Sequence, residues 1–469
     1  MNLIKLLSIV LVGVLILLFN GCSSDSNNKL KNGSKIILSK QDELFLDSLQ
    51  YAAFLYFLEE INPDNGLVKD RTASWSASSI AAVGFAIPSY AVGAERKWIT
   101  RNEAAQKVKT ILNFFFNSEQ SKSKTATGYK GFYYHFLNMK NGKRDYNSEL
   151  STIDTGILLS GIIFARQYFN QDNQTESAIR SIADKLIERL DWNFFIMETN
   201  DEYNNSICMG WKPESGFHHM GWVGYNEAIL LYILAAGGNL NNSIDAYHAW
   251  TSGYKWREPY ANLAHVIFPP MFGHQYSHIF IDFRGIVDEY MQKKGIDYFE
   301  NSRRATLTQQ RYAIENPLNW LGYDSLTWGI TASDGPGEKY SSSDKKFYSY
   351  AARGTSGKDS VLFDDGTLAP TAVAGSIVFA PELCLPTLKN IHQKYSSKGL
   401  WGKYGMLDAF NPSLNWYNSD YLGIDQGPIV LMIENFRTAM IWKYFMSDPI
   451  VQRGLKILGF KKLNSKGTK

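Results

Sequence analysis

The 469-residue chain lacks the features that mark several large classes of protein. It contains only 3 cysteines, and one of them, Cys22, lies near the N-terminus. Cys208 and Cys384 can therefore form at most one disulfide, which excludes a disulfide-stapled fold. A formal net charge of only +3 argues against a dedicated nucleic-acid binder. The sequence also lacks Walker A, Rossmann and G-x-S-x-G signatures, so neither nucleotide binding nor a serine hydrolase is indicated.

The N-terminus carries the pattern of a targeting signal. Residues 1–5 are short and basic, and residues 6–19 form a run of apolar and small residues that leads into FNGC at 19–22. The run is too short to span a bilayer comfortably and has the length of a signal-peptide core. The cysteine after glycine is similar to a bacterial lipobox. We therefore expect residues 1–21 to be a lipoprotein signal peptide and Cys22 to be lipidated; an ordinary signal peptide with a chance cysteine is the alternative.

The rest of the chain predicts a tether followed by one folded body. Residues 22–39 are polar and are expected to separate the lipid from that body. The expected location is the bacterial cell envelope, facing the periplasm or the outer-membrane surface, with membrane contact through the lipid anchor only. Residues 40–463 contain no Pro/Gly/Ser-rich linker, charge block or low-complexity tract. We expect them to form a single domain and the protein to be a monomer.

Six segments of helical length are apolar on nearly every side. Residues 149–169 read ELSTIDTGILLSGIIFARQYF, which after the first six residues has almost no polar face and predicts a buried helix. The other five segments are residues 74–87, 224–237, 274–291, 369–385 and 423–442. Amphipathic stretches at 38–60, 100–116 and 175–192 alternate with the first three of the six. Two concentric layers of helices, six in each, give an all-α (α/α)6 barrel with long loops at one end. Between residues 301 and 370, Gly- and aromatic-rich loops weaken the helix assignment.

Acidic residues recur at the starts of the predicted inner helices. In a barrel of this kind the inner helices run parallel, so their N-termini gather at one end. Glu149, Asp154, Glu214, Glu227 and Asp425 lie at or just before such starts, and Asp334 lies in a loop of the kind that borders this end. Asp154 fits a capping box with Ser151, and Asp425 could likewise cap its own helix, so both have a structural alternative. Glu149 and Glu227 have no obvious role in holding a helix. Several converging carboxyls suit glycoside hydrolysis, in which one acid protonates the leaving oxygen and a second activates water or attacks the sugar.

The aromatic content and two histidines add to this interpretation. Aromatic residues make up 14% of the chain, including 12 Trp and 27 Tyr, and the surplus over an ordinary core suggests flat faces that stack on sugar rings. His274 and His278 would share a helix face, which permits metal ligation, but no third ligand is evident. We expect the pair to bind sugar hydroxyls or to lie in the core, and we expect no metal and no cofactor.

A series of motifs is similar to a known family. The series covers residues 71–460 in order and without a large gap; it consists of ELSTIDT, CMGWKPESGF, GYNEAILLY, HQYSHIFIDFRG, DYFENSRRAT, WGITASDGPG, GTLAPTAVAGSIVFAPE, LWGKYGMLDAFN and YLGIDQGPIVLMIENFRT. Together these motifs resemble the bacterial "glycoamylase" domain of glycoside hydrolase family 144, related modules of which occur in cyclic β-1,2-glucan synthases. The resemblance implies an (α/α)6 barrel that acts on β-1,2-linked glucan or oligosaccharides, either as an endo-β-1,2-glucanase or as an enzyme that releases sophorose from chain ends. The older label "glucoamylase" implies starch and is only a fold-level analogy.

The resemblance also implies roles for individual residues. Glu149, Asp154, Glu227 and Asp425 correspond to the acids of the family's active site. We predict Glu227 as the general acid, with its pKa raised by the apolar helix beneath it, and Glu149 or Asp154 as the group that activates water, with inversion. A pair about 5 Å apart would instead indicate retention. The remaining predicted substrate-binding residues are Trp211, Trp328, Trp401, Tyr225 and Tyr421 as sugar platforms, Arg353, His274 and His278 as hydroxyl donors, and Glu214, Asp334 and Asp425 as further polar groups.

Two other functions stay open at this point. A non-catalytic glycan-binding lipoprotein needs aromatic platforms but not acids at helix starts. A polysaccharide lyase on the same toroid would use Tyr and His for proton abstraction and would need a uronic acid substrate. Endo or exo action depends on whether a loop, around residues 334–354 or 197–208, walls off one end of the cleft.

Overall fold

The computed structural model describes residues 38–463. The chain divides into two units, Met1–Ser39 and Lys40–Lys469, and every helix and strand named below belongs to the second. The predicted signal peptide, the lipidated Cys22 and the tether as far as residue 37 lie outside the described residues, so these stay predictions. Within residues 38–463, none of the helices combines the length and the apolar character needed to cross a membrane.

Six helices form the inner layer. They are α3 (Ile80–Glu95), α5 (Thr152–Tyr168), α7 (Ile229–Gly237), α9 (Tyr276–Phe280), α12 (Pro370–Ala374) and α14 (Gly423–Thr438). Every residue of α7 is buried, as its uniformly apolar sequence requires. Helix α3 packs between α5 and α14, α5 also contacts α7, and α14 also contacts α9 and α12.

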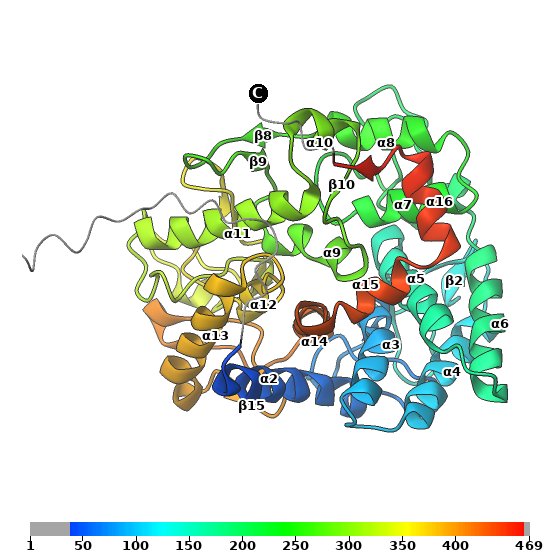
Figure 1. Cartoon of the computed structure of the whole chain (residues 1–469), viewed down its shortest axis with the longest axis horizontal. Coiled ribbons are helices and arrows are strands. Elements are labelled where there is room, and N and C mark those ends of the chain that lie inside the picture. The colour runs from blue at the N-terminus through cyan, green and yellow to red at the C-terminus, as the bar shows by residue number, and fades with distance from the viewer. Residues whose placement is uncertain (1–37, 464–469) are drawn as a thin grey trace, which may run out of the picture. The chain divides into compact units, whose positions relative to one another are not determined.

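Six mostly amphipathic helices cover the inner layer. They are α2 (Lys40–Glu59), α4 (Arg101–Asn117), α6 (Gln174–Glu188), α8 (Ser243–Ser252), α11 (Tyr298–Glu315) and α13 (Pro381–Tyr395). Each of α2, α4, α6, α8 and α13 packs on an inner helix: on α14, α3, α5, α7 and α12 respectively. Figure 1 shows α14 end-on, with α2 beside it. This arrangement is the (α/α)6 barrel that the sequence predicts. The remaining helices are α10 (Glu289–Lys294), α15 (Met440–Phe445) and α16 (Pro449–Ile457), and the 3-10 turns are η1 (Trp192–Phe195), η2 (Met271–His274), η3 (Glu338–Tyr340), η4 (Ser396–Lys398) and η5 (Pro412–Leu414).

Three of the predicted inner segments end earlier than their apolar sequence suggests. In the 274–291 segment, α9 stops at Phe280, and the chain is extended through Ile286–Val287 before α10 begins. In the 369–385 segment, α12 ends at Ala374 and Pro381 starts an outer helix, because proline forces the preceding residue out of the helical conformation. In the 423–442 segment, Ala439 has a left-handed φ of 57° that separates α14 from α15.

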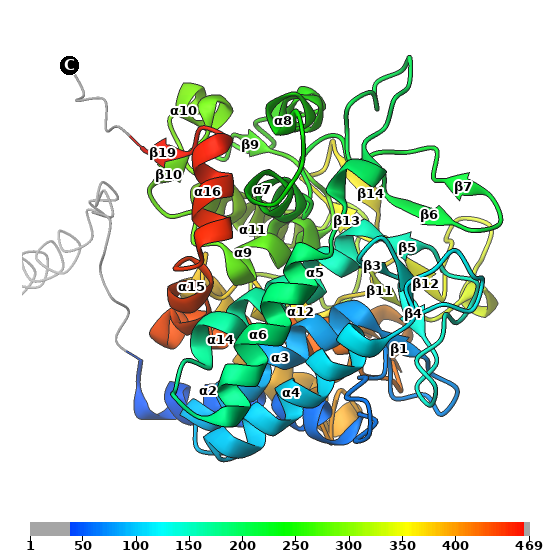
Figure 2. The ribbon, with the colours of Figure 1, turned by 90° about the vertical axis from the view of Figure 1, so that its right-hand side faces the viewer.

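Most of the short strands lie on one side of the helices, on the right of Figure 2, whereas β10 and β19 pair on the other side. Most belong to loops that precede inner helices. The strands are β1 (Ser78–Ser79), β2 (Gly128–Tyr129), β3 (Phe132–Tyr133), β4 (Phe136–Leu137), β5 (Leu150–Ser151), β6 (Gly210–Lys212), β7 (Gly216–Phe217), β8 (Trp256–Arg257), β9 (His265–Val266), β10 (Ile286–Val287), β11 (Ser333–Asp334), β12 (Tyr350–Ala351), β13 (Gly354–Thr355), β14 (Val361–Phe363), β15 (Trp401–Gly402), β16 (Gly405–Met406), β17 (Phe410–Asn411), β18 (Trp416–Tyr417) and β19 (Lys461–Lys462). These small antiparallel sheets fix the loops beside the starts of α3 and α5, where β1 and β5 lead directly into the helices.

Candidate active site

The first turns of the inner helices surround one cavity. Its volume is about 410 Å³. Its walls contain residues at the starts of α3, α5, α9 and α14, together with Glu227, which lies just before α7; among them are Ser79, Ala81, Asp154, Ile157, Tyr276, Leu422 and Ile424. Five of the six inner helices therefore direct their N-terminal ends toward this inner cavity, where backbone N–H groups and the helix dipoles favour negative charge.

A second cavity of about 690 Å³ opens beside the first. His135, Ile153 and Asp154 line both, so the two form one continuous cleft. The outer cavity is bordered by Glu149 and by aromatic residues of β6, β7 and the following loop, namely Trp211, Phe217, His218, His219 and Trp222. The cleft thus joins a deep carboxyl-bearing part to a broader aromatic part.

Glu227 is free of any helix-capping duty. The Asn226 carboxamide oxygen accepts a hydrogen bond from the Ala228 N–H at 2.9 Å, so Asn226 holds the start of α7. The Oε2 atom of Glu227 is buried and has no hydrogen-bond partner among the described residues. Burial raises the pKa of Glu227 from about 4.5 to about 7, and the nearby Asp154 charge adds to the rise. A carboxyl in this state can carry a proton at neutral pH and donate it into the inner cavity.

Glu149 and Asp154 lie on either side of a histidine. His135 Nδ1 lies 3.1 Å from Glu149 Oε1, and His135 Nε2 lies 3.6 Å from Asp154 Oδ2. Ser151 caps α5 by accepting from the Asp154 N–H, and its hydroxyl donates to Asp154 Oδ2 at 2.5 Å. Strand β6 packs closely on Glu149 at Gly210. A Cβ at Gly210 would lie only 2.8 Å from Glu149 Cγ, so this close approach requires glycine.

The positive charge of His135 and the negative charges of Glu149 and Asp154 stabilise one another. Burial alone would lower the pKa of His135, but Asp154 and Glu149 outweigh it and raise the pKa to about 9. Burial would raise the pKa of Glu149, yet its hydrogen bond to His135 holds that pKa at about 2. At neutral pH this wall of the cleft therefore carries an imidazolium between carboxylates.

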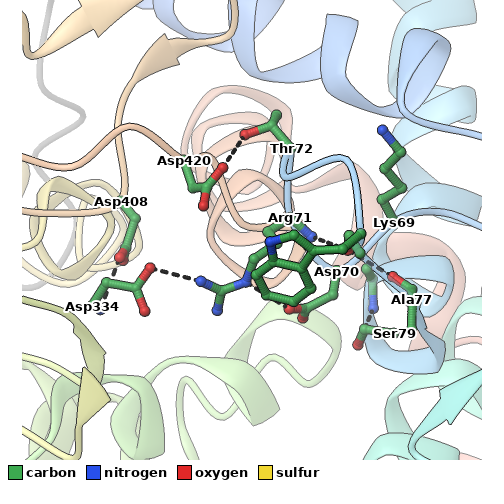
Figure 3. A network of polar contacts seen from close by, with 12 residues as sticks. Lys69, Asp70, Arg71, Thr72, Ala77, Ser79, Asp334, Asp408 and Asp420 are labelled. Carbon is green, nitrogen blue, oxygen red and sulfur yellow. Dashed lines mark hydrogen bonds and ion pairs between the residues drawn. The ribbon is translucent and has the colours of Figure 1, made fainter. Parts of the chain in front are cut away.

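Another wall of the inner cavity contains a network of loop residues (Figure 3). Arg71 Nη1 pairs with Asp334 Oδ2 at 2.8 Å, and Arg71 Nε lies 3.3 Å from Asp70 Oδ2. The Asp334 N–H donates to Asp408 at 2.9 Å, and Thr72 donates to Asp420 at 2.8 Å. Arg71 and Tyr350, the cross-strand partner of Asp334, both line the inner cavity. The contacts tie the loop before α3 to the loops of β11 and of residues 408–420.

Two further carboxyls are buried behind this network. Burial raises the pKa of Asp408 to about 7, with a contribution from the charge of Asp334. Burial also raises the pKa of Asp425, and the neighbouring Asp408 raises it further. The Tyr276 hydroxyl donates to the Ile424 carbonyl at 3.2 Å, and burial together with the charges of Asp425, Glu227 and Asp154 raises its pKa. The charges of Asp425, Glu227 and Asp154 thus act on one tyrosine, Tyr276, which lines the inner cavity.

Four of the five predicted sugar platforms do not border the cleft. Trp328 is fully buried and donates its indole N–H to Thr387 at 2.9 Å. Tyr225 is buried among aromatic rings, and the buried Tyr421 donates to the Gly405 carbonyl at 3.3 Å. Trp401 packs on His392 with ring centroids 4.5 Å apart and lies outside both cavities. The platform prediction is wrong for these four, and Trp211 alone of the five borders the cleft.

The predicted hydroxyl donors are also structural. Arg353 is fully buried in a bidentate pair with Asp365 at 2.9 and 2.8 Å. His274 faces the Phe268 carbonyl and His278 faces Ser302; both are buried, and burial lowers the pKa of each, to about 3 for His278. Glu214 pairs with Arg144 at 2.7 Å at the rim and does not line the cleft. Asp334 pairs with Arg71, and the charge of Asp425 acts on Tyr276, but neither acid lines the cleft itself.

Sequence reasoning missed His135, Arg71, Tyr276, Tyr350 and Trp222, all of which line the cleft. Four of them occupy loops or two-residue strands, where no helical periodicity distinguishes a cleft residue from any other. For His135 the available signal was a single histidine within the aromatic run FYYHF, a short distance before Glu149.

The fold and the cleft define an (α/α)6-barrel protein with a candidate carboxylate active site at the N-terminal ends of its inner helices. The chain belongs to the Glycoamylase family, described as "Putative glucoamylase", whose sequence profile matches residues 219–449. A relative from Parabacteroides distasonis, the exo β-1,2-glucooligosaccharide sophorohydrolase (non-reducing end), is 30% identical over 451 residues, which cover 88% of this chain. The chain spans 58% of the length of that curated relative.

Solved structures agree with the family assignment. A "putative glucoamylase" from Bacteroides uniformis superposes with a TM-score of 0.77 at 32% identity, covering 91% of this chain and 99% of the other. An endo-β-1,2-glucanase from Chitinophaga pinensis, solved with sophorotriose and glucose, gives a TM-score of 0.75 at 27% identity, with 91% and 99% covered.

Proposed function

We propose that this protein is a glycoside hydrolase that cleaves β-1,2-glucan or β-1,2-glucooligosaccharides. The observation that carries the proposal is that Asp154 and Glu227, which are 73 residues apart in the sequence, line the same 410 Å³ cavity. The two carboxyls differ in environment: Glu227 is buried and its Oε2 atom has no hydrogen-bond partner among the described residues, whereas Asp154 lies beside a histidine. Two carboxyls held in different environments are what acid-base cleavage of a glycosidic bond requires. The linkage is supported by the relatives from Parabacteroides and Chitinophaga, both of which are named for β-1,2-linked glucose polymers.

In the proposed mechanism Glu227 is the general acid. Its proton passes to the glycosidic oxygen as the bond to the anomeric carbon breaks. Asp154 takes a proton from a water molecule, which attacks the anomeric carbon from the opposite face and inverts its configuration. Glu149 is a poor candidate for this step, because the His135 contact holds its pKa at about 2 and a base so weak accepts a proton inefficiently at neutral pH.

The outer cavity is the proposed binding site for the next sugars of the chain. Trp211 and Trp222 border it, and the Trp222 indole N–H is fixed by Thr152 at 2.9 Å. Indole faces give apolar area to sugar C–H groups while their edges remain polar. A glucan chain can therefore extend from the reacting bond toward these rings.

We further propose that cleavage takes place near a chain end. The Arg71–Asp334 ion pair and the Thr72–Asp420 bond join loops from distant parts of the sequence (Figure 3), and Arg71 lines the inner cavity. In this proposal, a substrate that enters through the outer cavity passes the reacting carboxyls first and then reaches the loops joined by these two contacts. Release of a short product such as sophorose is the expected result. The Arg71→Ala variant would then shift the products toward a mixture of lengths.

We also propose that the full chain is a lipoprotein of the cell envelope, anchored through Cys22. Fatty-acid labelling of the full chain and of a Cys22→Ala variant tests this, and equal labelling of the two would contradict it.

Chromatography of the early products from linear β-1,2-glucan tests the function. Sophorose as the first product supports hydrolysis at chain ends, and a ladder of sizes supports endo cleavage. Binding of the glucan without release of reducing ends would indicate a glycan-binding protein, and an unsaturated product that absorbs ultraviolet light from a uronic acid polymer would indicate a lyase. One-dimensional NMR of the first product reports the anomer, and a β-anomer would contradict inversion.

A further inference from the structure

His135 has no part in the proposed proton transfers, although it is one of three residues that line both cavities. Its backbone is fixed on two sides. The His135 N–H donates to the Glu149 carbonyl at 2.9 Å, and the His135 carbonyl accepts from the Ile80 N–H at 3.2 Å, at the start of α3. Its ring stacks on Phe136 with centroids 3.9 Å apart and an interplanar angle of 16°. The imidazole is therefore held at one place between α3 and α5.

Both ring nitrogens of His135 face carboxylate oxygens. Nδ1 lies 3.1 Å from Glu149 Oε1, and Nε2 lies 3.6 Å from Asp154 Oδ2. An ionised carboxylate accepts hydrogen bonds and donates none, so a neutral imidazole would leave one nitrogen lone pair against an oxygen lone pair. The imidazolium, which carries an N–H on both nitrogens, is the form that fits this position.

The surrounding charges favour the same form. Besides Glu149 and Asp154, Asp70 acts on His135 from the loop before α3, where it is partly offset by its own neighbour Arg71. Lys212 acts on Glu149 from β6, and Glu227 feels the charge of Asp154 from the start of α7. The charges of three acids thus act on one histidine, and the Arg71 guanidinium is bound to Asp70 and Asp334. The His135 pKa of about 9 reflects this balance.

We propose that His135 is a positioning residue that stays an imidazolium in the working enzyme and holds Glu149 and Asp154 as oriented carboxylates, so that Asp154 remains available as the base opposite Glu227. This inference rests on the proposed function in one respect, since it takes Asp154 as the base and Glu227 as the acid. Without the cation, Glu149 and Asp154 would be like charges near each other, and protonation of one of them would relieve the repulsion.

The pH profile separates this role from simple support of the fold. In a His135→Gln variant the acid limb of kcat/KM, which reports protonation of the base, is expected to move upward by about one pH unit or more. The alkaline limb, which reports loss of the Glu227 proton, is expected to stay in place because burial is the main cause of that pKa. An exposed histidine on α8, His248, supplies the matched control, and His248→Gln should leave both limbs unchanged. A His135→Gln variant that lowers kcat/KM equally at every pH would overturn the proposal.

A direct titration keeps the proposal testable apart from any hydrolytic activity. The chain has 8 histidines, so NMR of protein with isotopically labelled histidine can follow each imidazole. One signal is expected to titrate near pH 9 and to be absent from His135→Gln. A Glu149→Gln variant, which retains His135, should lower that midpoint by about one unit. A His135 midpoint below 7, or one that Glu149→Gln does not move, would contradict the inference even if the protein hydrolyses β-1,2-glucan. Absence of hydrolysis together with the expected titration would sink the proposed function and leave the imidazolium in place.

Discussion

Both walls of the cleft combine a cation with several carboxyls, but the pKa of a neighbouring carboxyl is lowered on one wall and raised on the other. On one wall His135 lies between Glu149 and Asp154, and the pKa of Glu149 falls to about 2. On the other wall the cation Arg71 is bound to Asp70 and Asp334, and the two acids behind it, Asp408 and Asp425, have raised pKa values. Contact with His135 lowers the pKa of Glu149, whereas burial raises the pKa values of Asp408 and Asp425, and that of Asp70 despite its contact with Arg71.

This difference assigns separate tasks to the walls. The histidine wall supplies negative charge that can accept a proton from water. Glu227 lies near Asp154 but has no cation contact, and it keeps its proton to about pH 7. The arginine wall ties loops together, and in the proposed function it limits how far a substrate can enter. The position of the cation on each wall therefore affects the pKa values of the neighbouring acids as much as the number of acids does.

The largest effect is expected from removal of the acid. Glu227→Gln keeps the shape and burial of the side chain but cannot donate the proton, so kcat on β-1,2-glucooligosaccharides should fall by about 10³-fold with the fold intact. Initial rates of reducing-sugar release and circular dichroism measure the two effects. Glu188→Gln, an exposed position on α6, is the control and should retain full activity. Near-normal turnover of Glu227→Gln would remove Glu227 from the mechanism.

The same substitution should change how stability depends on pH. The folded chain holds the Glu227 proton up to a pKa of about 7, whereas the unfolded chain releases it near 4.5. Wild-type stability from this group is therefore fully present below pH 4.5 and is lost as the pH rises through 7. Glu227→Gln has no such loss, so between pH 4.5 and pH 8 its free energy of unfolding should gain about 3 kcal/mol relative to wild type. Urea unfolding at both pH values measures the difference, and an identical pH dependence in the two proteins would refute the raised pKa.

The two walls can be compared directly through one acid from each. Asp154→Asn removes the proposed base and should lower kcat by about 10²-fold. Asp425→Asn replaces an acid whose pKa is raised by burial and which lines neither cavity, so its effect should be smaller. Initial rates for both variants at pH 6 test the order. If Asp425→Asn is the more damaging change, the base lies on the arginine wall and the assignment of Asp154 is wrong.

The smallest predicted effect concerns the aromatic rim. Trp211→Ala should raise KM for longer oligosaccharides by about tenfold with little change in kcat, because it removes one sugar platform outside the reacting centre. Trp328→Phe, in contrast, should lower the thermal midpoint without a specific effect on KM, since Trp328 lies in the core and bonds Thr387. Equal KM values for wild type and Trp211→Ala would leave the outer cavity without a binding role.

Apolar periodicity predicted much of this molecule, and its limits are physical. Five of the six predicted inner segments contain an inner helix, and the sixth, residues 74–87, overlaps α3, which begins at Ile80 and continues to Glu95. The acids at the segment starts include Glu149, Asp154 and Glu227, which line the cleft. Helix ends were missed where a local conformation such as that of Ala439 stops a helix in an apolar sequence.

The rest of the site depends on contacts between distant residues. His274 and His278 have the same chemistry as His135, but the fold buries the first two and places the third beside two carboxylates. Likewise, Trp211 borders the outer cavity whereas Trp328 is fully buried in the core. Burial of a side chain is decided by what packs against it from far along the chain, and a single sequence does not contain that information.

A crystal structure of the Glu227→Gln variant with a β-1,2-linked glucotriose would test the central claim most directly. We predict that a glycosidic oxygen lies within hydrogen-bond reach, about 3 Å, of the amide at position 227. Asp154 should face the anomeric carbon from the opposite side of the ring, and further sugars should lie against Trp211. A trisaccharide bound with its glycosidic oxygens away from position 227, in the outer cavity alone or elsewhere, would contradict the account.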